Sequence, residues 1–296
     1  MRFVRYQNGN YTVTIDTKTG TKIRQNDLDF FKADFPESMD IKICDRCDMN
    51  CPQCHENSTP NGKCGDIMSE SFIDKLHPYT ELAIGGGNPL EHPDLIPFLE
   101  RCKNLKLIPS MTVNQIHFEK NVDLLKDLTE KKLIYGLGIS LVNANIEFIK
   151  HLEQLPNAVI HVINGMSADP MNLINLAHRN LKILILGYKE FRRGIEHYEK
   201  EKVKIDLRKD NLYSMLPIII KEKWFEVVSF DNLAVQQLEA KRLMSEEDWN
   251  QFYMGDDGSA TMYVDMVKRE FAKSSTSTER YPLEDNIETM FKKIRV

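Results

Sequence analysis

The sequence predicts an α/β protein in which a mainly parallel sheet is covered by helices. Between residues 36 and 230, short apolar and β-branched segments alternate with helix-forming segments. That alternation is typical of parallel strands joined by helices. Residues 1–35 and 231–296 have different patterns, so we expect an N-terminal β extension, a central α/β body and a C-terminal α/β cap.

In the extension, polar and apolar residues alternate over residues 3–6, 11–16 and 21–25, with turn-forming residues between these stretches. This pattern predicts a small antiparallel meander. In the body, strands are expected at 40–43, 82–84, 108–113, 133–140, 159–163, 181–186 and 226–230, and helices at 95–102, 122–128, 146–155, 173–178 and 212–220. The cap should contain a helix at 233–243, a strand at 261–267 and a helix at 287–294.

Right-handed crossovers curl such a series into a barrel or an open arc, and a doubly wound sheet is the alternative. With 296 residues, 42% of them hydrophobic and 28% charged, the chain can bury a sizeable core. The formal net charge of −5 argues against nonspecific nucleic-acid binding. No signal peptide or membrane span is evident, so we expect a cytoplasmic protein without membrane contact.

Three cysteines, Cys47, Cys51 and Cys54, lie within eight residues. Thiolates this close can ligate three irons of a [4Fe–4S] cluster and leave the fourth iron open for chemistry. Cys44 permits another interpretation, because Cys44-x-x-Cys47 and Cys51-x-x-Cys54 also form two zinc-type pairs. Zinc pairs are normally a dozen or more residues apart. The spacing therefore favours the iron–sulfur cluster.

The cysteine spacing resembles the signature of the radical S-adenosylmethionine (radical SAM) enzymes. That resemblance implies a partial (β/α)6 barrel and a free iron that chelates the amino and carboxylate groups of SAM. It also implies reductive cleavage of SAM to a 5′-deoxyadenosyl radical, which abstracts hydrogen from a substrate. Gln53 stands where the family usually has an aromatic residue near the adenine.

A glycine run, Gly85, Gly86 and Gly87, follows the second expected strand of the body. Residues without a side chain let a ligand approach the backbone closely. The run resembles the family's Gly-Gly-Glu motif, which receives the SAM amino group. Asn88 occupies the place of the acid, so backbone carbonyls and an amide oxygen would make this contact.

Polar residues end three further strands: Asn114, Ser140 and Asn164. In a barrel, the carboxyl ends of the strands converge on the active site. The family often places a serine at the Ser140 position on the ribose or carboxylate of SAM, and all three residues are candidate cofactor contacts. The alternative for Ser140 is a hydroxyl that only satisfies the end of its strand.

Candidate substrate contacts are His55 and Glu56, directly after the cysteines, and Asp231 and Asn232, after the last strand of the body. An acid–amide pair could recognise the edge of a heterocycle. Helix capping is the alternative at both places. Cys64 is either a hydrogen-atom donor or a passive thiol.

We expect radical SAM catalysis on a small polar substrate, with a modified nucleobase or nucleoside as one candidate, in the manner of queuine lyase or viperin-like enzymes. Modification of a peptide is the alternative, and a zinc or iron–sulfur regulatory protein is the rival outside the enzyme class. A flavodoxin or ferredoxin is the expected reductant. No catalytic side chain is assigned, and a lyase, a dehydratase or another radical reaction fits equally well.

Overall fold

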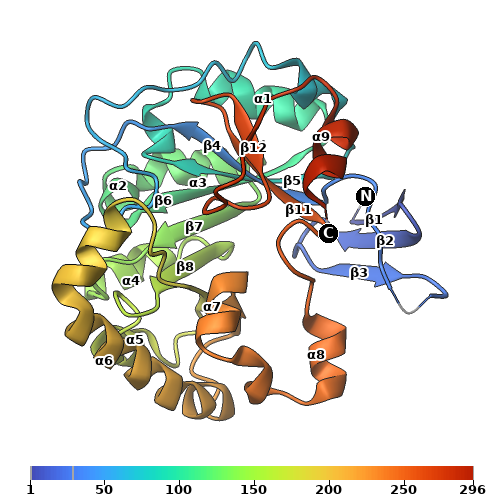
Figure 1. Cartoon of the computed structure of the whole chain (residues 1–296). Helices are drawn as coiled ribbons and strands as arrows, with labels where there is room; N and C mark the ends of the chain where they lie inside the picture. The colour runs from blue at the N-terminus through green and yellow to red at the C-terminus, as the bar shows by residue number, and fades with distance from the viewer. Residues whose placement is uncertain (1, 29, 296) are drawn as a thin grey trace.

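The computed structural model describes residues 2–28 and 30–295, and its centre is a ten-stranded sheet (Figure 1). The strand order is β10-β9-β8-β7-β6-β5-β4-β11-β12-β13, and every pair from β10 to β11 is parallel. The strands are β4 (Ser38–Cys44), β5 (Glu81–Gly86), β6 (Ile108–Asn114), β7 (Gly136–Ser140), β8 (Ala158–Ile163), β9 (Lys182–Leu186), β10 (Val227–Phe230), β11 (Thr261–Asp265), β12 (Glu270–Ala272) and β13 (Tyr281–Pro282). The expected α/β fold with a largely parallel sheet is confirmed.

Alternate residues of these strands form the core. Ile41 pairs with Ile84, Ile84 with Met111, and Met111 with Leu137, so apolar residues continue from strand to strand on one face. All four are at most 2% exposed. Since fully burying such a side chain contributes ~1.5–3 kcal/mol, this face fixes the register of the sheet. The opposite face, which we call the inner face, carries polar residues such as Ser140 and His161 as well as apolar ones such as Val159 and Leu184, and these four are only partly buried.

Most of the helices cover the apolar face of the sheet, whereas α8 (Glu246–Phe252) lies apart from the sheet and buries none of its residues (Figure 1). The other helices are α1 (Leu95–Asn104), α2 (Gln115–Lys120), α3 (Val122–Glu130), α4 (Ile146–Leu152), α5 (Pro170–Leu176), α6 (Arg193–Lys221), α7 (Asn232–Gln237) and α9 (Ile287–Ile294), with 3-10 turns η1 (Ser71–Lys75), η2 (Pro89–Glu91) and η3 (Ala240–Leu243). The short helix α2 was not expected, because six residues carry too little periodicity to be recognised.

Helix α6 is much longer than the predicted helix at 212–220. Its first half is rich in Lys and Glu and leaves Val203 and Leu207 exposed, so no apolar stripe reveals it in the sequence. The helix bends at Glu201, where the backbone is non-helical. The single expected helix at 233–243 is likewise divided, into α7 and η3.

The N-terminal strands β1 (Phe3–Asn8), β2 (Tyr11–Asp16) and β3 (Lys22–Gln25) form a separate antiparallel sheet in the order β1-β2-β3. Glu37 joins this sheet to the body. Its buried carboxylate accepts a hydrogen bond from the Tyr11 hydroxyl at 2.5 Å and pairs with Arg24 at 2.9 Å. The extension is thus fixed at the start of β4.

The C-terminal segment extends the main sheet. Strand β11 pairs in parallel with β4, so that Tyr263 lies beside Asp40 and Asp265 beside Lys42. Strands β12 and β13, which were not expected, then add an antiparallel edge. They are three and two residues long, which is too short to show an alternating pattern.

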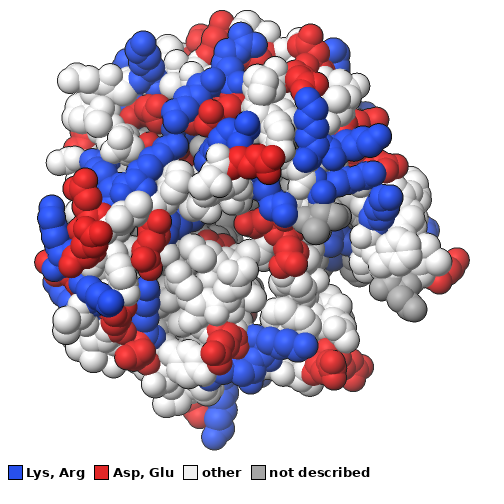
Figure 2. Space-filling view, viewed as in Figure 1, with Lys and Arg blue, Asp and Glu red and all other residues white. Residues whose placement is uncertain are grey.

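Lysine and arginine lie among aspartate and glutamate on the face shown in Figure 2. This mixture agrees with the net charge of −5. In the described part of the chain, no helix combines the length and apolar character needed to cross a membrane.

Candidate functional site

The three motif cysteines lie on a loop that leaves the carboxyl end of β4. We call residues 45–63 the cysteine loop. Backbone hydrogen bonds fold it back on itself, from Asp45 to Lys63 at 2.7 Å and from Cys47 to Thr59 at 2.9 Å. Cys47, Cys51 and Cys54 are free and partly exposed. The loop therefore presents three thiols at the carboxyl edge of a parallel sheet.

Cys44 and Cys64, which lie at the two ends of the cysteine loop, are bonded to each other in a disulfide. Cys64 was expected to be either a passive thiol or a hydrogen-atom donor, and both expectations are wrong because its sulfur is bonded to Cys44. The pairing also removes Cys44 from a tetrahedral zinc site with Cys47. The four-cysteine zinc set therefore lacks one free thiol, whereas the three-cysteine set for an iron–sulfur cluster, Cys47, Cys51 and Cys54, is complete.

These three thiols suit a cationic metal cluster. Burial, and to a smaller extent the charges of neighbouring thiols, raises the pKa of Cys47 and of Cys51. Thiolates held this close repel one another, and iron ions would compensate that charge. Gln53, between them, has a buried side-chain oxygen without a hydrogen-bond partner among the described residues. That oxygen is a free acceptor beside the cysteines.

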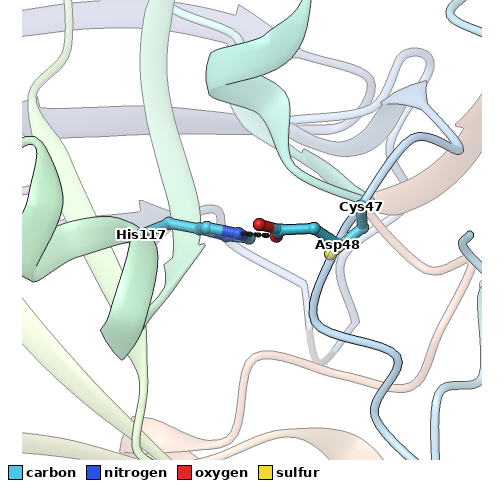
Figure 3. A group of neighbouring side chains, drawn as sticks. All are labelled: Cys47, Asp48 and His117. Carbon is cyan, nitrogen blue, oxygen red and sulfur yellow. Dashed lines mark hydrogen bonds and ion pairs between the residues drawn. The ribbon is translucent and has the colours of Figure 1, made fainter. Parts of the chain in front are cut away.

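His117 supports the cysteine loop from α2, and the sequence did not point to it (Figure 3). Its Nε2 lies 2.5 Å from the Asp48 carboxylate, and the imidazole is buried. Ligand atoms of Cys47, Asp48 and His117 lie within 4.8 Å of one another. Such a set could bind zinc, but here the imidazole and the carboxylate already pair with each other. We assign His117 to orienting the loop next to Cys47.

The three glycines of the run differ in their surroundings. A Cβ at Gly85 would meet nothing within 4 Å, so this position faces open space. At Gly86, where φ is +114°, a Cβ would lie 2.5 Å from the Cys44 oxygen, and at Gly87 it would lie 2.3 Å from the Arg46 oxygen. Gly86 thus lets β5 pack against β4, and Gly87 lets the chain after β5 pack against the cysteine loop. Of the three glycines, only Gly85 faces space that a ligand could fill.

The Asn88 side chain, predicted to replace the family's acid, makes local contacts. Its oxygen accepts from the Leu90 amide at 3.3 Å, and its nitrogen donates to Glu91 at 3.1 Å. Asn114 likewise caps α2 through the Ile116 amide. Asn164 is fully buried and donates to Gln237, but its oxygen has no partner among the described residues.

A row of polar side chains crosses the inner face of the sheet. Asn114 pairs with Ser140 in register, and Ser140 pairs with His161. The His161 ring lies over Gly138, where a Cβ would come within 2.4 Å of Cε1. Burial without a compensating charge lowers the pKa of His161 to about 4. His161 is thus a neutral imidazole on the inner face. This residue was not among the candidates from the sequence, although its alternation with Ile160 and Val162 in β8 indicates that it faces away from the apolar side.

The two residues after Cys54 have different surroundings. His55 is partly exposed, and the Lys189 ammonium lies 3.3 Å from its Nε2. Glu56 is buried and contacts Lys42, Arg192 and Tyr263. Burial opposes its ionisation, but His55 and Lys42 outweigh that effect and hold the Glu56 pKa well below its usual range. This carboxylate is occupied by the protein itself, so His55 is the better placed of the two for a substrate.

Asp231 and Asn232, the other predicted substrate pair, act at a helix start. The Asp231 carboxylate accepts from the Ala234 amide at 2.7 Å and from the Gly187 amide at 2.9 Å. Asn232 donates to Asp257 at 2.7 Å. The capping alternative weighed for Asp231 is what the structure shows, and the pair has few polar groups left for a heterocycle.

The state of His161 gives a testable pH dependence. The unfolded chain binds a proton at this residue near pH 6.5, and the folded protein does so only near pH 4. Unfolding is therefore favoured as pH falls through this window. Between pH 6 and 5, the wild type should lose up to ~1.4 kcal/mol more stability than His161→Asn. Urea unfolding at both pH values measures this, and parallel pH profiles would contradict it.

Solved structures that are similar to this chain include three of SuiB from Streptococcus suis. SuiB bound to the precursor peptide SuiA has a TM-score of 0.62 and 13% identity, with 98% of this chain and 87% of that chain covered. SuiB bound to S-adenosylmethionine has a TM-score of 0.60 and 12% identity, with 95% of this chain and 84% of that chain covered. A further crystal structure of SuiB has a TM-score of 0.57 and 11% identity, with 91% and 81% covered.

No family model matches the chain, and no curated protein matches its sequence. At 11–13% identity, the likeness to the three structures shows a shared fold. The chain therefore has the fold of SuiB, with three free cysteines on the loop after β4.

Proposed function

We propose that the protein is a radical SAM enzyme that acts on a peptide. The observation that carries the proposal is the group of free thiols Cys47, Cys51 and Cys54, placed at the carboxyl edge of the sheet. Their spacing resembles the radical SAM signature, and the fold is shared with a protein that binds S-adenosylmethionine.

The residues of this chain would divide the work as follows. Cys47, Cys51 and Cys54 would hold the cluster, and the space beside Gly85 would admit the amino-acid part of SAM. A [4Fe–4S] cluster, when bound, supplies the electron that cleaves SAM and so generates a 5′-deoxyadenosyl radical. The inner face, with Ser140 and His161, would then bind and orient the substrate and keep water from the radical.

A peptide substrate is favoured over the nucleobase or nucleoside considered first. One of the similar structures is bound to a precursor peptide. Moreover, the acid–amide pair Asp231 and Asn232, which suggested a heterocycle, is engaged in capping and in a contact with Asp257. The proposal covers a lyase, a dehydratase or another radical reaction, because the fate of the substrate radical depends on the chemistry of the substrate.

The substrate class can be tested with an extract. Because a substrate couples SAM cleavage to turnover, it should raise 5′-deoxyadenosine formation above the substrate-free rate. We expect a low-molecular-mass extract of the source cells to do so, and protease digestion of that extract to abolish the increase. If the stimulating component survives protease but not nucleosidase treatment, a nucleoside is the substrate.

The cysteine assignment predicts a clear division among variants. Ala at Cys47, Cys51 or Cys54 should remove the iron–sulfur absorbance near ~400 nm and all 5′-deoxyadenosine formation after anaerobic reconstitution, because each thiolate is one iron's only protein ligand. Cys44→Ala and the buried-cysteine control Cys102→Ala should keep both. Loss of iron in Cys44→Ala with retention in Cys54→Ala would refute the ligand set.

The glycine run gives a matched pair of variants. Gly85→Val places a branched side chain in open space, so it should weaken SAM binding about tenfold or more while iron content stays normal. Gly86→Val pushes against the Cys44 backbone and should instead reduce iron incorporation. Calorimetric SAM binding and iron analysis separate the two. Equal SAM affinity of Gly85→Val and wild type would place the cofactor elsewhere.

A further inference from the structure

Lys42 lies in β4, two residues before its end, and its side chain is only 1% exposed. Three carboxylates surround its ammonium. The Nζ atom is 2.6 Å from Asp45, 3.0 Å from Glu56 and 3.1 Å from Asp265. We call these four residues the Lys42 charge group. The surrounding carboxylates outweigh the effect of burial and raise the pKa of Lys42, so it stays charged.

The three carboxylates come from segments that are far apart in the sequence. Asp45 precedes Cys47 by two residues, and Glu56 follows Cys54 by two residues. The Lys42 ammonium therefore binds the cysteine loop on both sides of the three cysteines, before Cys47 and after Cys54. Asp265 belongs to β11, the strand that pairs with β4, and is completely buried.

Further contacts make this arrangement rigid. Glu56 also pairs with Arg192 at 3.3 Å and accepts from the Tyr263 hydroxyl at 3.2 Å. The other Asp265 oxygen accepts from the amides of Val267 and Lys268 at 3.0 Å. A buried group of this kind is a poor source of net stability, but removing one member leaves uncompensated charges and is strongly unfavourable. The group therefore specifies a geometry.

We propose that Lys42 is the positioning residue of the cysteine loop, and that it holds the three thiols in the arrangement that retains an iron–sulfur cluster. The inference rests on the proposed function. Lys42 acts through Asp45 and Glu56 and does not itself bind the cluster. Without its positive charge, the carboxylates of Asp45 and Glu56 on the cysteine loop would be less compensated and would disfavour the reduced, more negative cluster.

The chain offers a matched control in Lys22. This residue is also buried, with 8% of its side chain exposed, and it also lies between two carboxylates, Glu37 and Glu81. It belongs to β3, and its two carboxylate partners lie outside the cysteine loop. Lys22→Met thus reports the general cost of removing a buried ammonium.

The experiment compares wild type, Lys42→Met, Lys42→Arg and Lys22→Met after anaerobic reconstitution. In Lys42→Met, iron retention against a chelator should weaken by about 10- to 100-fold, the usual effect of losing a residue that orients metal ligands. The midpoint potential of the remaining cluster should become more negative. Lys42→Arg should recover much of both, and Lys22→Met should lower stability with iron retention and potential unchanged.

If Lys42→Met does not fold, Lys42→Met/Asp265→Leu removes one of the unpaired carboxylates and should restore folding but not iron retention. Equal iron retention and potential in Lys42→Met and Lys22→Met would overturn the positioning role alone. A wild-type protein that takes up no iron would instead overturn the proposed function. The two failures are therefore distinguishable.

Discussion

The structure depends on one constraint, the alternation of side chains along parallel strands that are covered by helices on one face. Residues such as Ile41, Ile84 and Met111 must face the helices, because exposing them would forfeit their burial free energy. Their neighbours in sequence then necessarily face the other way. Asp40, Lys42, Ser140 and His161 are on the inner face for this reason.

The carboxyl ends of the parallel strands lie at one edge, so the loops that follow β4 and β5 are close together. The Gly87 amide donates to the Cys44 carbonyl at 2.6 Å, and the Asn88 amide donates to the Arg46 carbonyl at 2.7 Å. These contacts allow a cysteine loop and a glycine run, about thirty residues apart, to form one site. The Cys44–Cys64 disulfide joins the two ends of the cysteine loop, and the ion pairs of Lys42 with Asp45 and Glu56 add contacts closer to the cysteines.

Much of the fold could be predicted because its signals are local. Strand β2 was expected within its observed bounds, and β5, β6, β8 and β9 were expected to within two residues at each end. Helix α6 was underestimated, since its polar first half gains stability from a few contacts such as Ile205 rather than from a continuous apolar stripe. Strands β12 and β13 are defined by pairing with β11, and pairing partners cannot be read from two or three residues.

The sequence by itself determined the cysteine spacing, the glycine run and the strand alternation, because each is a pattern among close neighbours in the chain. Only the tertiary structure decided which polar groups remain free. In the tertiary structure, the side chains of Asn88 and Asp231 cap helices. Cys44 is bonded to Cys64, and His161 lies beside Ser140. The tertiary structure also brings Asp265 to Lys42 across more than two hundred residues. Contacts over such separations follow from strand pairing and packing of the whole sheet, and no local pattern encodes them.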